Sequence, residues 1–118
     1  MNDLLSSEAT IEVRRPRPDA AVVVVSGEHD LTSAKQLNET LTTALTDCTH
    51  LIVDLSSAAF IDSSIISALV NAKKHADEAN RKFNLVLAST PIVERVLEIT
   101  RVLPGLNRVK TLDEALAA

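Results

Sequence analysis

The side chains best suited to metal binding or nucleophilic chemistry are three histidines, His29, His50 and His75, and a single cysteine, Cys48. The histidines are widely separated and match no metal-ligand or catalytic-triad spacing. Cys48 has no second cysteine or partner histidine in a reactive motif, so we expect it to be inert. The two glycines are too few for a loop that cradles phosphate. The sequence therefore predicts neither a metal site nor a nucleotide hydrolase, and no cofactor is expected.

The tripeptide Asp62-Ser63-Ser64 places a carboxylate and two hydroxyls directly before an apolar run of helical period. Such oxygens accept the free backbone N–H groups of a first helical turn. Taken from the residues alone, Ser63 is favoured as a helix cap, and Ser64 is expected to be one too. Asp30 follows Gly27-Glu28-His29 and, judged from the residues alone, is an ordinary turn residue.

A strand and a helix must hold this tripeptide in place. The consecutive apolar residues Leu51, Ile52 and Val53 predict a strand over 51–55 that is covered on both faces, which is typical of a parallel sheet. A serine-bearing turn follows, in which Phe60 and Ile61 return the chain to the core. A helix is then predicted from Ser63 to about Asp77. Its expected buried positions include Ile66, Leu69 and Val70.

The amino-terminal half of the chain predicts a hairpin and a helix. Residues 9–15 alternate and indicate a half-buried strand, residues 15–19 contain two prolines and indicate a turn, and residues 20–26 indicate a central strand. A helix is expected over 33–45, capped by Thr32 or Ser33.

After the helix that begins at Ser63, residues 83–88 predict another strand, and Ser89-Thr90-Pro91 predicts a helix start. The expected buried face of that helix consists of Ile92, Val93, Val96, Leu97 and Ile99. Residues 102–107 indicate a loop, 108–110 a short edge strand, and Thr111 to Glu114 a capping box that opens a last helix. Strands alternate with helices after an initial hairpin, so the predicted class is α/β, with a mostly parallel mixed sheet of four to five strands flanked by helices.

Composition limits the possible partners. With 118 residues we expect one domain over 1–118, with residues 1–8 frayed. A net charge of −4 and an aromatic content of 2% argue against nucleic-acid binding. No apolar run is long enough to span a membrane, and the amino terminus lacks a leader pattern. The lone cysteine fits a reducing compartment, so a cytoplasmic protein is expected.

Two sequence signatures resemble those of the STAS domain family, most closely its small bacterial anti-sigma factor antagonists. They are Gly27-Glu28-His29-Asp30, after the second strand, and Asp54-Leu55-Ser56 through Phe60-Ile61-Asp62-Ser63-Ser64. Ile65 stands where the family usually has glycine. Because a β-branched residue does not readily adopt a positive φ, we expect the chain at Ile65 to be helical or extended.

The resemblance implies a STAS-like fold and a regulatory binding protein rather than an enzyme. Ser63 maps onto the residue that the cognate anti-sigma factor phosphorylates, and that partner is a serine kinase with a histidine-kinase-like ATPase fold. A serine phosphatase would reverse the modification. Asp30 maps beside the phosphorylated residue. The remaining residues implied to bind the partner or to neighbour the phosphosite are Asp62, Ser64, Glu28 and His29.

In that interpretation the unphosphorylated protein captures the anti-sigma factor and frees a sigma factor for transcription. Two alternatives remain open. The first is a non-switching STAS scaffold or transport-accessory subunit in which Ser63 is only a helix cap. The second is a weak nucleotide-binding protein or phosphotransferase. We further expect Asp30 and Ser63 to lie close together at one end of the sheet, because loops that follow parallel strands meet at a common edge.

Overall fold

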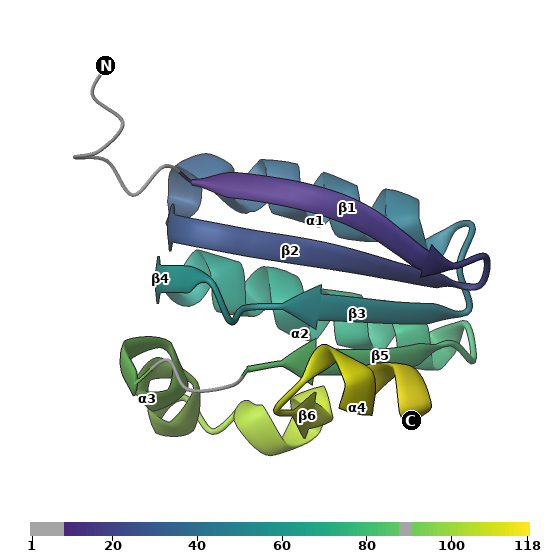
Figure 1. Cartoon of the computed structure of the whole chain (residues 1–118). Coiled ribbons are helices and arrows are strands. Elements are labelled where there is room, and N and C mark those ends of the chain that lie inside the picture. The colour runs from purple at the N-terminus through teal and green to yellow at the C-terminus, as the bar shows by residue number, and fades with distance from the viewer. Residues whose placement is uncertain (1–8, 88–90) are drawn as a thin grey trace.

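The structure is a computed structural model that describes residues 9–87 and 91–118. After an initial hairpin, strands and helices alternate along the chain except for two consecutive strands before the second helix, as Figure 1 shows. The elements are, in chain order, β1 (Thr10–Arg17), β2 (Ala20–His29), α1 (Leu31–Leu45), β3 (His50–Asp54), β4 (Ala58–Ile61), α2 (Ser63–Glu78), β5 (Lys82–Val86), α3 (Pro91–Ile99), the 3-10 helix η2 (Leu103–Leu106), β6 (Arg108–Val109) and α4 (Leu112–Ala117). The predictions for residues 1–8 and for Ser89-Thr90 lie outside the described residues.

The sheet has six strands in the order β1-β2-β3-β5-β6, and β4 pairs with the far end of β2. Among the described residues, the β1–β2 pair alone is antiparallel, and the other pairs are parallel. The predicted α/β class with a mostly parallel mixed sheet is therefore confirmed. The expected four to five strands become six because β4 forms in the segment predicted to be a turn.

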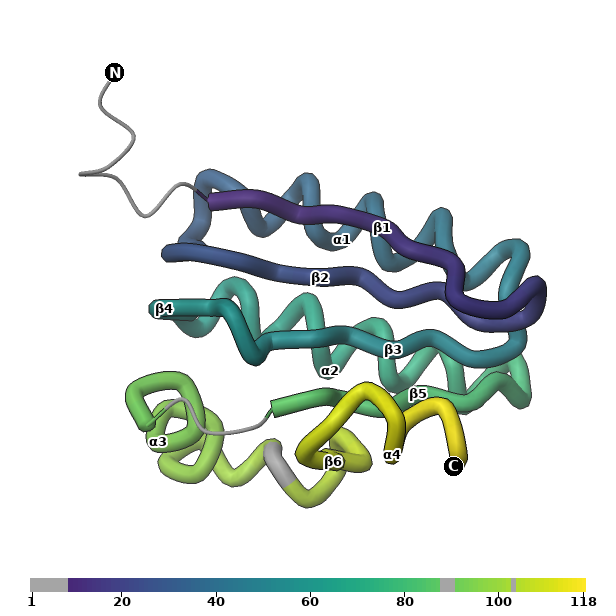
Figure 2. The backbone as a smooth tube through the Cα atoms, viewed as in Figure 1, coloured from purple at the N-terminus to yellow at the C-terminus, as the bar shows by residue number. Residues whose placement is uncertain are grey.

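The two faces of the sheet are covered unequally. Alternate strand residues such as Val23, Val53 and Leu85 are register partners and face the larger core, which α1, α2 and α3 complete. On the opposite face, a small cluster that includes Ile52 packs against Ala115 of α4. Figure 1 shows α1 and α2 behind the sheet and α4 in front of it, and Figure 2 shows the same path as a tube. Burial on both faces explains the unbroken apolar sequence of β3.

Helix α2 buries Ile66 and Leu69 as predicted, but Val70 is 42% exposed, so the prediction for Val70 is wrong. Val70 lies on the flank of the buried stripe, where no neighbouring element covers it fully. In α3, Val93 and Leu97 are buried, whereas Ile92 and Ile99 are exposed, so the predicted buried face was too wide.

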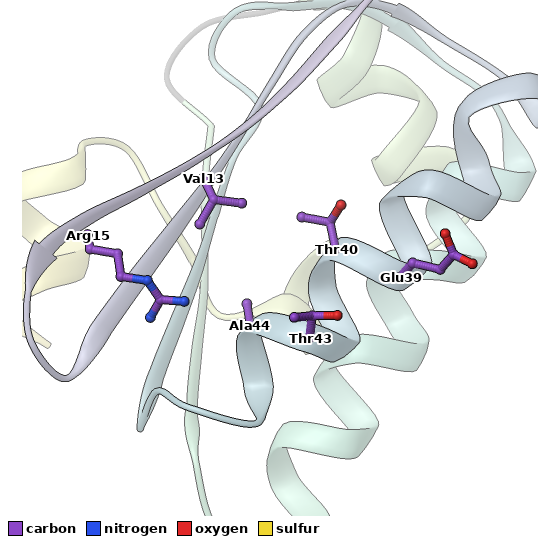
Figure 3. A pocket seen from close by; sticks show the side chains of 6 residues that line it. All are labelled: Val13, Arg15, Glu39, Thr40, Thr43 and Ala44. Atoms are coloured by element: carbon purple, nitrogen blue, oxygen red, sulfur yellow. The ribbon is translucent and has the colours of Figure 1, made fainter.

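The first hairpin is longer than predicted. Strand β1 continues to Arg17 across an irregularity between Arg14 and Arg17, so the connection to β2 is Pro18-Asp19 instead of the whole of 15–19. β1 forms an outer edge of the sheet. A hollow of about 310 Å³ separates it from α1 (Figure 3).

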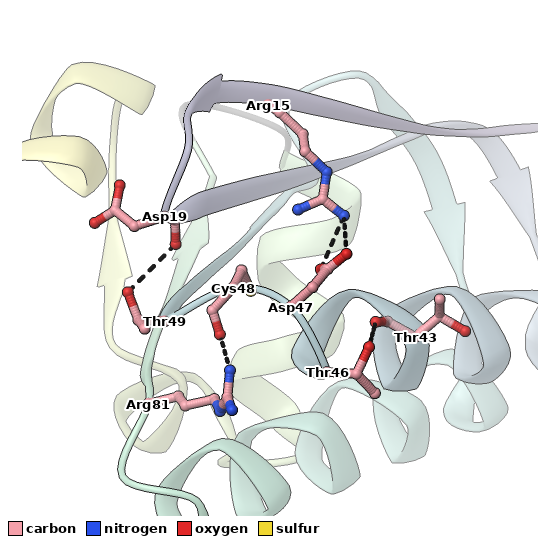
Figure 4. A network of polar contacts seen from close by, with 8 residues as sticks. All are labelled: Arg15, Asp19, Thr43, Thr46, Asp47, Cys48, Thr49 and Arg81. Atoms are coloured by element: carbon pink, nitrogen blue, oxygen red, sulfur yellow. Dashed lines mark hydrogen bonds and ion pairs between the residues drawn. The ribbon is translucent and has the colours of Figure 1, made fainter.

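At the end of the sheet where β2 and β3 begin, side chains tie loops together (Figure 4). The Arg15 guanidinium donates to both carboxylate oxygens of Asp47 at 3.0 and 3.2 Å, and Arg81 donates to the Cys48 carbonyl. Cys48 itself is buried, and burial raises the pKa of its thiol. Nearby in the sheet, the buried His50 ring bonds the Asn84 side-chain oxygen at 2.7 Å, a pair that the sequence does not signal.

The carboxyl-terminal predictions are confirmed in most details. Thr111 and Glu114 form a complete capping box at the start of α4, and Pro91 is the first residue of α3. The predicted loop over 102–107 contains the η2 turn, and the short strand after it is β6. Within the described ranges, no helix has the length and apolar character needed to cross a membrane.

Leu69 and Val70 are adjacent on α2 but differ in burial, which provides a matched test of this packing. Leu69 is fully buried, so Leu69→Ala should lower the free energy of unfolding by about 2–5 kcal/mol. Val70→Ala should cost clearly less, because Val70 is 42% exposed. Urea titration monitored by circular dichroism measures both. Equal losses in the two variants would show that α2 packs differently.

Candidate functional site

Two helices begin side by side at one end of the sheet. The end of β2 runs parallel to β4, with His29 and Ile61 as register partners. The next residues, Asp30 and Asp62, are the N-caps of α1 and α2. Because neighbouring strands lie about 4.7–4.9 Å apart, the two caps start from adjacent positions. The structure thus brings together two segments that are about thirty residues apart in the sequence, as we expected for Asp30 and Ser63.

The two caps have the same chemistry. Oδ1 of Asp30 accepts hydrogen bonds from the Thr32 backbone N–H at 2.9 Å and from the Thr32 hydroxyl at 2.6 Å. Oδ1 of Asp62 accepts from the backbone N–H groups of Ser64 and Ile65 at 3.0 and 3.2 Å, and from the Ser64 hydroxyl at 2.5 Å. Each carboxylate therefore satisfies donors of its own first helical turn.

These bonds keep both carboxyl groups ionised. The hydroxyl of Thr32 holds the pKa of Asp30 below its usual value, and the hydroxyl of Ser64 does the same for the pKa of Asp62. The negative charge of Asp30 acts in the opposite direction and raises the pKa of Asp62 by a smaller amount. Two like charges therefore influence each other across the site, and the surface there is acidic.

Ser63 is the first residue of α2, and its side chain is exposed. Its hydroxyl makes no hydrogen bond to any residue in the described part of the chain. The prediction that Ser63 serves as a cap is wrong, because Asp62 has the extended backbone of an N-cap and accepts the bonds. Ser64 is not the cap either, since its hydroxyl donates to Asp62.

The same correction applies to α1. Asp30, and not Thr32 or Ser33, is the N-cap, so the helix starts at Leu31 rather than at Ser33. Ile65 is helical and fully buried, which confirms that this position has no positive φ and shows that it anchors the first turn of α2 in the core.

His29 is a buried structural residue of the site. The residue is 1% exposed, and both ring nitrogens are bonded: Nε2 lies 2.8 Å from the Ser26 carbonyl oxygen and Nδ1 lies 2.9 Å from the Ser33 hydroxyl. The carbonyl can only accept, so Nε2 carries the proton in the neutral ring. His29 thereby links the end of β2 to the first turn of α1. Glu28, its neighbour, is exposed and lies beside Phe60 of β4 in the register.

Two apolar side chains flank the acidic pair, and neither was predicted to be part of the site. Leu31 is 74% exposed and Phe60 is 41% exposed, so the prediction that Phe60 returns to the core is wrong, whereas Ile61 is buried as expected. For Leu31 a signal existed, because its six-residue distance from the buried Leu37 does not match the helical period. Exposed apolar side chains next to a polar site are a common feature of protein-binding surfaces.

The arrangement combines an unbonded, accessible serine hydroxyl, two ionised carboxylates and flanking apolar side chains. None of the described residues forms a cluster of three or more His, Cys, Asp or Glu side chains that could hold a metal ion. His50 and His75 lie on other elements, at the start of β3 and near the end of α2. The surface is thus suited to contact a protein and to accept a modification on Ser63.

The fold and this surface together define a small α/β domain built like solved anti-sigma factor antagonists. The chain belongs to the STAS domain family, whose model matches residues 11–115. An anti-sigma factor antagonist from Mycobacterium paratuberculosis is 27% identical, with a TM-score of 0.84 and coverage of 96% of this chain and 97% of that one. The resemblance inferred from the two sequence signatures is therefore confirmed.

Two further solved structures share the fold. A STAS domain protein from Planctomyces limnophilus is 25% identical, with a TM-score of 0.78 and coverage of 91% of this chain and 95% of that one. The Bacillus cell fate determinant SpoIIAA, solved in its phosphorylated form, is 18% identical, with a TM-score of 0.69 and coverage of 92% and 97%. At this identity the SpoIIAA comparison supports the fold alone.

The capping roles can be tested by comparing adjacent residues. Asp62→Ala removes the acceptor of the first-turn N–H groups and should lower the free energy of unfolding by about 0.5–2 kcal/mol. Ser63→Ala removes a hydroxyl that bonds nothing in the described structure, so its effect should stay within about 0.5 kcal/mol. Chemical denaturation of both variants measures the difference. A larger loss in Ser63→Ala than in Asp62→Ala would contradict the assignment of the cap.

The lowered pKa values of Asp30 and Asp62 predict a specific acid response. Each ionised carboxylate stabilises the fold fully above its ordinary pKa of 3.8. That stabilisation is lost as the pH falls from there through the lowered folded-state value. Asn caps a helix about as well as Asp but does not titrate. The Asp30→Asn, Asp62→Asn double variant should therefore lose less stability than wild type between about pH 5 and about pH 2.

Urea midpoints measured at several pH values provide this comparison. Asp113→Asn, outside both caps, controls for the loss of negative charge alone. Stability curves of wild type and double variant that run parallel across the acid range would show that neither cap depends on its ionised form.

Proposed function

We propose that this protein is an anti-sigma factor antagonist whose binding to its partner is controlled by phosphorylation of Ser63. The unphosphorylated form captures an anti-sigma factor that has a histidine-kinase-like ATPase fold, and a sigma factor is released for transcription. The same partner phosphorylates Ser63, and the complex then dissociates. A serine phosphatase removes the phosphate and restores the form that binds the anti-sigma factor. The protein has no catalytic activity of its own in this scheme, and it acts in the cytoplasm.

One observation carries the proposal: Ser63 is exposed and its hydroxyl has no bond to the described residues, although it stands at a helix start where serines usually cap. Asp62 performs the capping instead, so the Ser63 hydroxyl is available to a kinase. The 27% identical antagonist from Mycobacterium paratuberculosis supports the class of partner. SpoIIAA, which shares this fold, has been solved in a phosphorylated form.

The physical effect of the phosphate would fall on the complex and leave the fold intact. A phosphoserine carries about −1.5 to −2 charges near pH 7, and the N-terminus of a helix tolerates an anion. The new charge would add to those of Asp30 and Asp62, on a surface flanked by Leu31 and Phe60. A partner that buries the apolar side chains must desolvate all these charges, so phosphorylation should weaken docking by repulsion and by desolvation cost.

The first test is phosphorylation itself. The Ser63→Ala variant is immobilised and used to isolate the anti-sigma factor from an extract of the native cell. The isolated factor is then incubated with wild-type protein and ATP. Mass spectrometry should find phosphate on Ser63. Incubation with ATP or GTP alone is the control, because phosphate gained without the partner would favour a nucleotide-binding protein or phosphotransferase instead. Absence of phosphate in both reactions would favour a non-switching STAS scaffold or transport-accessory subunit.

The second test separates charge from folding. Ser63→Ala should bind the anti-sigma factor as wild type does, whereas Ser63→Asp should bind about 5–150-fold more weakly, the range of a regulatory coupling. Asn71→Asp, at an exposed position two turns further along the same helix, is the matched control and should bind as wild type does. Added salt should restore only part of the lost affinity because the surface is desolvated on docking. Titration calorimetry measures the affinity of each variant, and scanning calorimetry measures its melting temperature. Equal affinities in all forms would refute the switch.

A further inference from the structure

Strand β1 presents an open backbone edge. It is at one end of the sheet, and among the described residues its only partner is β2. Native edge strands are usually shortened, interrupted by proline or covered, because their free N–H and C=O groups can pair with other strands. Here the pairing with β2 is regular from Thr10 to Arg14, and the irregularity and Pro16 come only after that point. The edge from Thr10 to Arg15 can therefore accept another strand.

The sequence of this edge is complementary to itself in one antiparallel register. A two-fold axis at Val13 places Glu12 opposite Arg14 of a second copy, and Arg14 opposite the Glu12 of that copy. Opposite charges at facing positions stabilise a strand pair, and like charges destabilise it. Registers centred on Glu12 or on Arg14 place identical charges against each other at the axis. The Glu12–Arg14 ion pair within one chain, at 2.7 Å, shows that both side chains are on the same face.

The hollow between β1 and α1 supplies space on the other face (Figure 3). Val13 is 44% exposed and borders this hollow of about 310 Å³, with Thr40 and Ala44 of α1 across from it. In the register centred on Val13, the valines of the two copies face each other on this side. Pairing would thus bury an apolar side chain that a single copy leaves open to solvent.

From this self-complementary edge we infer that two copies of the protein associate through antiparallel β1–β1 pairing centred on Val13, which joins their sheets into one. The pairing is limited to residues 11–15. Arg15 is held by Asp47 (Figure 4), and Pro16 has no N–H to donate. Such an interface is small, so the dimer is weak and depends on concentration. Ser63 lies on α2 and is not part of it, so this inference stands or falls separately from the proposed switch.

Sedimentation equilibrium from about 10 μM to about 1 mM protein is the test, because small interfaces give weak complexes. Wild type should dimerise within this range. Arg14→Glu and Glu12→Arg should each weaken the dimer by about tenfold or more, because two symmetry-related attractions become repulsions. The Glu12→Arg, Arg14→Glu double variant restores opposite charges and should dimerise again. Arg95→Glu, exposed on α3, should behave as wild type, and thermal melting verifies that every variant is folded.

A register-specific cross-link provides a second readout. In a Cys48→Ser background, Val13→Cys places two thiols opposite each other and should form a disulfide-linked dimer on mild oxidation. Glu12→Cys, which faces Arg14 of the second copy, should link far less. Three results would overturn the inference: wild type that stays monomeric at about 1 mM, single charge variants that associate as tightly as wild type, or a folded double variant that does not recover. Preferential linking of Glu12→Cys would overturn the register.

Discussion

The parallel pairing of β4 with the end of β2 is the constraint on which the site depends. β2 pairs with β3 over Ala20–Val24 and then, after a shift in register at Gly27, with β4. Gly27 has a φ of 84°, a conformation that glycine adopts without steric cost, and its N–H donates to the Ser57 carbonyl at 3.0 Å. This step carries the chain from one partner strand to the other. Without it, the starts of α1 and α2 would not be neighbours.

Because both caps are aspartates, capping the helix and presenting a free hydroxyl fall to adjacent but different residues. A serine in place of Asp30 or Asp62 would have to accept the first-turn N–H groups with its own hydroxyl. Because Asp62 accepts those bonds, the hydroxyl of Ser63 is left outside the network of the helix. His29 fixes the position of the first turn of α1 relative to β2, since its two ring nitrogens bond Ser26 of β2 and Ser33 of α1. The side chain that caps the helix and the side chain that we propose is phosphorylated are thus different residues.

The sequence was sufficient to predict the elements whose patterns are long. The apolar runs of β2 and β3 and the helical period of α2 predicted the parallel core, and the Thr111–Glu114 pair predicted the cap of α4. Strand β4 could not be predicted, because its four residues, Ala58–Ile61, are buried only at the two ends and do not alternate. Its pairing with β2 depends on a tertiary contact, which local pattern does not encode.

The errors at the site have a related cause. Asp, Ser and Thr all cap helices, so a stretch such as Asp62-Ser63-Ser64 contains several equivalent candidates. The backbone decides among them, since the cap must be extended while the next residue is already helical. Phe60 and Val70 were expected to be buried because they are large and apolar. Their exposure depends on what lies beside β4 and α2, and a sequence-based helical or strand pattern describes only the element itself.

The occupied donors at the start of α2 also determine how a phosphate on Ser63 would act. A helix N-terminus ordinarily binds anions through its free N–H groups. Here the N–H groups of Ser64 and Ile65 donate to the Asp62 carboxylate, and that of Ile66 donates to the Asp62 carbonyl. A phosphoryl group could bind the N–H groups of Ser64 and Ile65 only by displacing the ionised Asp62. We therefore expect the phosphate to remain on the surface beside that carboxylate, where its charge acts mainly on whatever docks there.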